Sequence, residues 1–135
     1  MDSVSDFFIR IKNAYLVKKD RVAVPFSKMG HEMAKILERK GFISAIRKKK
    51  KRIKNLEARE FLFLELRLKY EDGEPALSGV RLVSKPSRRI YMKKNEIKPV
   101  RSGYGVLIIS TSKGVMTGDE AKDLGLGGQA IAQVW

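Results

Sequence analysis

The sequence predicts a mixed α/β (α+β) protein made of two small lobes. The first half alternates the three-and-four spacing of helices with the every-second-residue spacing of strands. Residues 71–75, Glu-Asp-Gly-Glu-Pro, form the best break in the chain, and helical periodicity mostly disappears after them. A chain of 135 residues suits one domain or two small lobes packed together. We expect an N-terminal helix–strand–helix–strand–strand lobe over residues 1–70 and a C-terminal, mostly β lobe with one short helix over residues 71–135.

Two helices and a short strand open the first lobe. Apolar side chains at three- and four-residue spacing predict a helix over residues 4–18, and a strand over residues 22–24 stops at Pro25. Ser27 is placed to cap a second helix, and Gly41 to end it in a left-handed turn. The expected inner face of this helix carries Met29, Met33, Ile36 and Leu37.

A pair of strands with a basic connection completes the first lobe. One strand begins over residues 42–47, and residues 60–70 return with clear alternation. The face expected to be buried carries Leu62, Leu64, Leu66, Leu68 and Tyr70. Between them, the basic hairpin 47–54 holds seven Lys or Arg residues and no acid. Two interpretations of it stay open: a solvated basic loop between two strands, or a clamp that neutralises phosphates without reading sequence.

Short strands dominate the expected second lobe. They are predicted at residues 79–84, 88–92, 105–110 and 129–135, with a turn or single helical turn at residues 93–97. One short helix fits residues 118–124, because Thr117 and Glu120 have capping-box spacing and Gly125 can close it.

The charge distribution points to an anionic partner, of which nucleic acid is the commonest large one. The chain holds 29 Lys and Arg against 15 Asp and Glu, a net charge of +14. The excess lies in two blocks, +7 over residues 47–54 and +8 over residues 81–113. In the second block the Lys and Arg residues are interleaved with Tyr, Ser, Thr and Gly, which suits a surface that touches RNA closely.

Cysteine and two kinds of segment are missing from the sequence. It has no Cys, which excludes disulfides, thiolate metal sites and cysteine nucleophiles. Its longest unbroken runs of large apolar residues have four members, whereas a membrane span needs about 20. The first residues are acidic and lack the apolar core of a signal peptide. We expect a reducing cytoplasmic context, with no cofactor, no membrane and no small-molecule substrate.

The sequence supports three further functional hypotheses only weakly. His31, the only histidine, is expected to be exposed opposite the core face of its helix, where nothing orients it for catalysis, so we expect no enzyme. Residues 110–114, Ser-Thr-Ser-Lys-Gly, superficially suggest a phosphate loop. Their order is wrong for the nucleotide-binding motif and no long helix follows, so a polar turn is favoured and a nucleotide-dependent enzyme remains a formal alternative. A peripheral membrane protein ranks last, because the charge lies outside the two helices.

The glycine-rich residues 125–129, Gly-Leu-Gly-Gly-Gln, allow two interpretations. They form either a helix C-cap followed by a bulge or tight turn, or bare backbone that lets a bulky ligand approach closely.

Short segments spread along the chain carry a family resemblance. In the first half they are Arg-Ile-Lys-Asn-Ala at residues 10–14, Val-Pro-Phe-Ser-Lys at 24–28 and Lys-Gly-Phe-Ile at 40–43. In the second half they are Leu-Lys-Tyr at 68–70, Ser-Lys-Pro at 84–86, Arg-Ile-Tyr at 89–91 and, most specific, residues 109–117. A double glycine at 127–128 and a terminal Val-Trp follow. In this order and spacing, the chain resembles the small-subunit ribosomal protein eight family, of bacterial type, nearly end to end.

This resemblance implies a two-lobed protein that binds a helix in the central domain of the small-subunit rRNA, helps that domain assemble and has neighbouring small-subunit ribosomal proteins as partners. The alternative is a translational regulator that binds an mRNA hairpin mimicking the rRNA site. The implied RNA-binding residues are Ser110, Thr111, Ser112 and Lys113 of the loop, Lys85, Ser87, Arg88 and Tyr91, and Gly127, Gly128 and Gln129 of the glycine turn. Secondary phosphate contacts are expected at Lys48, Lys49, Lys50, Lys51, Arg52, Lys12 and Lys28.

Two of these positions depart from the family pattern. Ser87 stands where the family usually has glycine, and Gln129 replaces the usual glutamate after the double glycine. Gln129 keeps a hydrogen-bond acceptor but loses a charge, which should ease its approach to phosphate.

Overall fold

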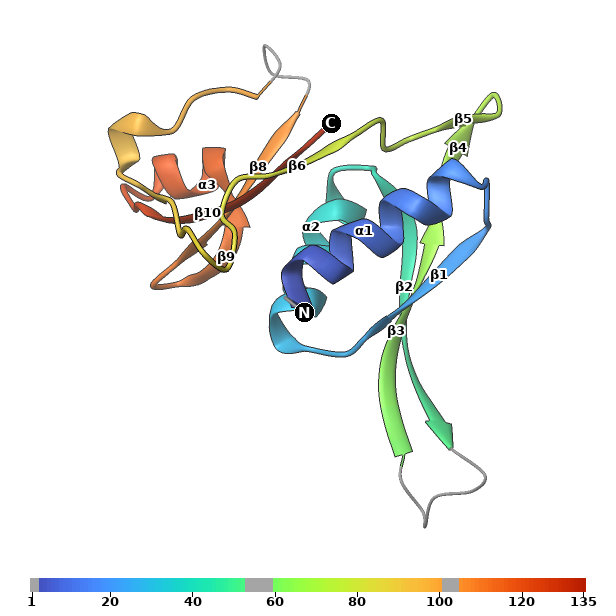
Figure 1. Ribbon diagram of the computed structural model, residues 1–135. Helices are drawn as coiled ribbons and strands as arrows, with labels where there is room; N and C mark the ends of the chain where they lie inside the picture. Colours follow the sequence, from blue (N-terminus) through green and yellow to red (C-terminus); the bar gives the residue numbers. More distant parts are fainter. Residues whose placement is uncertain (1–2, 53–59, 101–104) are drawn as a thin grey trace. The chain divides into compact units, whose positions relative to one another are not determined.

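The computed structural model describes residues 3–52, 60–100 and 105–135, and the chain divides into two compact units (Figure 1). We call Ile9–Ala76 the N-terminal unit, and Leu77–Trp135 together with Met1–Phe8 the C-terminal unit. Helices and antiparallel sheets occur together, which confirms the predicted α+β fold class. The lobe boundary expected at residue 70 stays a prediction.

The N-terminal unit is built around a three-stranded antiparallel sheet in the order β1–β3–β2. Its elements run α1 (Ser3–Leu16, which begins in the other unit), β1 (Arg21–Pro25), α2 (Lys28–Arg39), β2 (Ile43–Arg52), β3 (Glu60–Leu68), and a small hairpin of β4 (Tyr70–Glu71) and β5 (Glu74–Pro75). One face of the central strand is buried through Leu64, Leu66 and Leu68. The side chains of Phe63, Glu65 and Arg67 lie on the opposite face, because successive residues of a strand point to opposite sides.

Local capping signals determine where α2 begins and ends. The Ser27 hydroxyl accepts a hydrogen bond from the Gly30 amide at 2.9 Å, as predicted. Gly41 follows the helix with φ +82°, the left-handed conformation that glycine adopts without steric cost. Met33, Ile36 and Leu37 are buried on the inner face as expected.

Four burial or structure predictions for this unit are wrong. Met29 is 36% exposed and Leu62 is 38% exposed, so neither belongs to the core. His31 was expected to be exposed, but it is half-buried, with its ring centroid 6.0 Å from that of Phe26. The basic run is not a loop over residues 47–52, because these residues continue β2 in register with β3. Residues 53 and 54 of the predicted hairpin lie outside the described part of the chain.

The C-terminal unit contains a five-stranded antiparallel sheet centred on β10 (Gly128–Val134). Its other elements are β6 (Val80–Leu82), β7 (Tyr91–Met92), the 3-10 turn η1 (Lys94–Glu96), β8 (Val106–Thr111), β9 (Gly114–Thr117) and α3 (Gly118–Asp123). The order is β6–β10–β8–β9, and β7 also pairs with β10. The predicted cap of α3 is confirmed: the Thr117 hydroxyl accepts from the Glu120 amide at 3.2 Å. Strand β9 was not predicted.

One side of this sheet forms the core of the unit. Its fully or nearly buried members are Ile97, Val100, Leu107, Ile109, Met116, Ala121 and Ala130. Since Ile109 and Ala130 are paired across β8 and β10 and point into this core, the residues next to them along each strand point to the other side. Those neighbours include Ser110 and Gln129.

Candidate nucleic-acid interface

An open groove with a volume of about 700 Å³ lies on the C-terminal unit. Parts of β7, η1, β8 and β10 contribute to it, together with the turn that follows β8. Its lining residues are Tyr91, Met92, Lys93, Lys94, Glu96, Ser110, Thr111, Ser112, Gly127, Gly128 and Gln129. Seven of the eleven residues predicted to bind RNA are among them. The other four, Lys85, Ser87, Arg88 and Lys113, are exposed but do not line the groove.

A row of three side chains crosses the groove from strand to strand. Gln129 of β10 is paired with Tyr91 of β7 on one side and with Ser110 of β8 on the other. Directly paired residues of an antiparallel sheet point to the same face. Tyr91 is 72% exposed, so much of its side chain is accessible to a ligand. The row therefore combines an aromatic ring, an amide and a hydroxyl on one surface.

The three hydroxyls of Ser110 and Thr111 at the end of β8 and of Ser112 after it have different roles. The Thr111 hydroxyl donates to the Gly114 carbonyl at 2.9 Å and accepts from the Lys113 amide at 3.1 Å. Within the described residues, no hydrogen bond occupies the hydroxyl of Ser110 or Ser112. Gly114 has φ +113°, which favours glycine where the chain turns from β8 into β9. Thr111 thus holds the turn in shape while the two serines present hydroxyls to the groove.

The double glycine is required by the protein's own backbone. A Cβ atom on Gly128 would lie 2.1 Å from the Ser110 carbonyl oxygen, and one on Gly127 would lie 2.5 Å from the Met92 carbonyl oxygen. Neither atom can move away as a flexible side chain can. Gly125 lies directly after α3 with φ +70°. This confirms the helix C-cap that one of the two interpretations of residues 125–129 predicted. Close approach of β10 to β8 and of Gly127 to β7 is the structural reason for the two glycines that follow.

A tight turn over residues 85–88 is anchored beside the row by a buried serine. Lys85 and Arg88 exchange two backbone hydrogen bonds of 2.9 Å, which places Ser87 in the turn between them. The hydroxyl of Ser84 donates to the carbonyl of Ala130, next to Gln129, and accepts from the Ile90 amide at 2.9 Å. This contact ties the turn and the start of β7 to β10.

Ser84 and the lysines after β7 were missed by sequence reasoning. Ser84 is buried, and its hydroxyl donates to the carbonyl of Ala130, 46 residues further along the chain, so no local pattern marks it. Lys93 and Lys94 had a detectable signal, because a helical turn was expected there and both follow Tyr91 closely. Glu96, the one acid of the groove lining, accepts from the Lys93 amide at 3.1 Å and shapes that turn.

The predicted secondary phosphate contacts lie in the N-terminal unit and do not share one surface. Along β2, Lys48 is paired with the buried Leu64, whereas Lys49 and Lys51 lie on the opposite face. The Lys48 ammonium is 4.2 Å from the centre of the Phe26 ring. Lys12 on α1 and Lys28 at the start of α2 are exposed, and the side chain of Arg52 lies outside the described residues.

The described residues offer neither a metal site nor a membrane-spanning helix. They contain no group of three or more His, Asp or Glu side chains able to hold a metal ion. No helix in the described ranges is both long and apolar enough to span a membrane.

Accessible hydroxyls, an exposed tyrosine and lysines around an open groove are the chemistry of an RNA-binding protein. The model of the family described as Ribosomal protein S8 matches residues 2–135 of this chain. The chain is 43% identical to the small ribosomal subunit protein uS8 of Coprothermobacter proteolyticus, over 99% of this chain and 98% of the relative. Identity to the proteins of the same name from Thermodesulfovibrio yellowstonii and Dictyoglomus turgidum is 40% and 41%, over 99% of this chain and 98% and 97% of the relatives. The chain belongs to the ribosomal protein S8 family.

This family consists of structural, rRNA-binding proteins of the small ribosomal subunit. Its members work among the rRNA and the other proteins of that subunit. The resemblance read from the sequence is therefore confirmed, together with the structural role in the small subunit.

Proposed function

We propose that this protein binds a helix in the central domain of the small-subunit rRNA and aids the assembly of that domain within the cytoplasmic ribosome. The observation that carries this proposal is the row formed by Tyr91, Gln129 and Ser110 across three paired positions of the sheet. It sets a ring, an amide and a hydroxyl on one open surface, with the Ser112 hydroxyl in the same groove.

The chemistry of the row fits an RNA helix. The minor groove of A-form RNA is wide and shallow and displays 2′-hydroxyls, whereas its deep groove is too narrow for side chains. A serine hydroxyl donates one hydrogen bond and accepts others, so it can pair with a 2′-hydroxyl or a base edge. Tyr91 can stack on an unpaired base at the end of such a helix or beside it.

Charge supplies affinity around this uncharged centre. Lys93 and Lys94 belong to the groove lining, and Lys113, Lys85 and Arg88 are exposed elsewhere on the same unit. Contacts from these side chains to phosphates hold the RNA in register but do not read its sequence. The serine hydroxyls therefore carry the specificity, and the Lys and Arg side chains carry most of the salt-dependent affinity.

The experiment compares Ser112→Ala on two RNAs, the central-domain helix and a duplex of random sequence. Loss of one neutral hydrogen bond, about 1 kcal/mol, predicts about a fivefold weaker complex with the helix and less than a twofold change with the duplex. Ser78→Ala, at an exposed serine outside the groove, is the matched control and should leave both affinities unchanged. Equal losses on both RNAs would contradict a reading role for the loop.

Competition distinguishes the two RNA targets. An mRNA hairpin with the same minor-groove geometry would occupy the same groove. If such a hairpin displaces the rRNA helix from the wild-type protein at equal concentration, translational regulation becomes a second function. If the chain fails to speed folding of the isolated central domain, as followed by chemical footprinting, the assembly role is wrong.

A further inference from the structure

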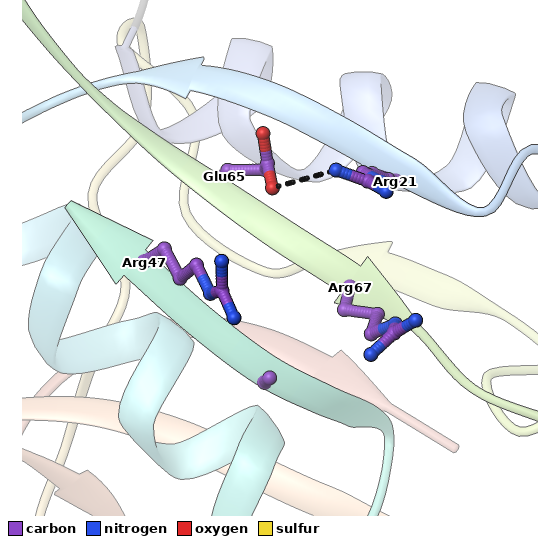
Figure 2. A pocket seen from close by; sticks show the side chains of 5 residues that line it. Arg21, Arg47, Glu65 and Arg67 are labelled. Atoms are coloured by element: carbon purple, nitrogen blue, oxygen red, sulfur yellow. Dashed lines mark hydrogen bonds and ion pairs between the residues drawn. The ribbon is translucent and has the colours of Figure 1, made fainter. Parts of the chain in front are cut away.

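The outer face of the N-terminal sheet carries a second concentration of positive charge. A hollow of about 160 Å³ is lined there by Arg21, Ala45, Arg47, Glu65 and Arg67. Figure 2 shows that the three arginine side chains and Glu65 project from neighbouring strands on this face. We propose that this hollow, with the basic strip that continues along β2, binds the phosphates of a single RNA strand.

The charges in the hollow are not balanced within the described part of the chain. Glu65 bonds Arg21 at 3.3 Å and Lys49 at 2.8 Å, and the Lys49 hydrogen bond is the main reason why the pKa of this carboxyl lies below its usual value. No described carboxylate lies within ion-pair distance of Arg47 or Arg67. Four cationic side chains therefore share this face with one carboxylate, which pairs with only two of them.

The strand register makes this imbalance costly for the protein alone. Arg67 lies directly opposite Arg21 in the β1–β3 pair, and like charges directly opposite each other destabilise a sheet. On the other side, Arg67 faces Ala45, whose small side chain leaves the hollow open. An oxyanion seated there would relieve the repulsion, because a guanidinium binds phosphate oxygens through two parallel N–H donors.

The strip beyond the hollow favours a nucleic-acid strand over an isolated anion. Arg47, Lys49 and Lys51 occupy every second position of β2, so they share the outer face at intervals of about 7 Å. Opposite the two lysines on β3 lie Phe63 and Phe61, of which Phe61 is 49% exposed. A basic track beside accessible aromatic rings is the arrangement that binds single-stranded nucleic acid, because phosphates follow the cations and bases stack on the rings. An acidic protein segment would use the charges and leave the rings without a role.

The test measures binding of fluorescein-labelled decauridylate, which has no helix for the groove of the C-terminal unit to read, to the full chain by anisotropy. The variant Arg47→Gln/Arg67→Gln should bind at least tenfold more weakly at low salt. Because each phosphate contact to a single strand contributes about 0.7 to the slope of log affinity against log salt, the slope should fall by about 1.4. Lys35→Gln/Lys40→Gln removes the same charge from exposed positions of α2 and its C-cap, and should change affinity less than threefold with an unchanged slope.

Two further variants keep the result independent of folding. Glu65→Gln releases Lys49 and Arg21 from their acid and should tighten decauridylate binding several-fold, a gain that a misfolded chain cannot produce. Phe61→Leu should weaken binding about tenfold on decauridylate but not on an abasic strand of the same length, because only bases stack.

Unchanged affinity and slope in the double arginine variant would overturn the proposal. So would a decaglutamate peptide that binds through Arg47 and Arg67 while decauridylate does not, which would assign the face to an acidic protein segment. Neither outcome bears on the groove, since Ser112→Ala is tested on a structured helix.

Discussion

Gln129 lies directly opposite Ser110 in the antiparallel pair formed by β10 and β8. The residue before it, Gly128, packs so closely on β8 that a Cβ atom there would lie 2.1 Å from the Ser110 carbonyl oxygen. The same carbonyl group therefore limits residue 128, while the side chain of Ser110 faces the groove beside Gln129. Strand packing and the proposed reading of RNA both depend on one short stretch of paired backbone.

Gly128→Ala tests this dependence. The added methyl group meets backbone atoms that cannot rotate away, so we expect a loss of about 3 kcal/mol in the free energy of unfolding, measured in urea. Gly125→Ala meets no atom within 4 Å but has φ +70°, and should cost only about 1 kcal/mol. Similar losses in the two variants would show that the contact with Ser110 is not the limiting one.

Thr111→Val tests the role of the threonine in shaping the loop. The substitution keeps the side-chain shape but removes the bonds to the Gly114 carbonyl and the Lys113 amide, so stability should fall by about 1 kcal/mol. Affinity for the rRNA helix should fall with it, because the neighbouring serines lose their fixed positions. Thr111→Ser restores the hydroxyl and should recover both quantities; a serine variant as weak as the valine variant would argue that the methyl group matters instead.

Ser84→Ala tests the anchor of the 85–88 turn. It leaves the partly buried Ile90 amide without its acceptor, which should cost about 1–3 kcal/mol in unfolding free energy. The Ile90 amide should also exchange its hydrogen faster with solvent, which NMR can follow residue by residue. Ser87→Ala, at an exposed position of the same turn, should change stability by less than about 0.5 kcal/mol. Unaltered exchange at Ile90 would remove Ser84 as the anchor.

Tyr15 makes the stability of the N-terminal unit sensitive to alkaline pH. Its hydroxyl donates to the Phe42 carbonyl and accepts from the Lys69 amide at 3.1 Å, and burial raises its pKa above the ordinary value of 10.0. The folded state therefore holds the proton longer than the unfolded chain. This contribution to stability is complete below the unfolded pKa and is lost as pH rises through the folded pKa.

Tyr15→Phe should accordingly lower the unfolding free energy by about 1–3 kcal/mol at neutral pH and flatten its decline above about pH 10. Urea unfolding at a series of pH values measures both effects. Tyr91→Phe, at an exposed position, should leave neutral-pH stability unchanged. A Tyr15→Phe curve parallel to that of the wild type would contradict the assignment.

Local features of the fold could be predicted from the sequence because their physical causes are local. Ser27 and Thr117 cap helices through bonds to amides three residues ahead, and Gly41 ends α2 by its own backbone conformation. The alternation in β3 likewise predicted the buried Leu64, Leu66 and Leu68. The same alternation failed at Leu62, which is paired with Lys50 of β2 and stays 38% exposed although its carbonyl accepts a hydrogen bond from the Phe26 amide at 3.1 Å.

Long-range pairing accounts for the remaining errors. The basic run 47–52 reads as a loop because its repeated charges offer no apolar face, yet β3 supplies every partner of its backbone. Strand β9 was missed for a similar reason: Gly114 and Thr117 have weak strand signals, and pairing with β8 compensates for them.

The sequence by itself determined the partner class and the residue types of the candidate interface, because charge, hydroxyls and glycines are properties of single residues. Only the tertiary structure decided which of these residues meet. Pairing through β10 brings Tyr91, Gln129 and Ser110 into one row, and pairing through β3 sets Arg21 beside Arg67. Strand register is a relation between distant segments, so a single segment cannot specify it. A shift of one residue would turn each of these side chains to the opposite face of its sheet.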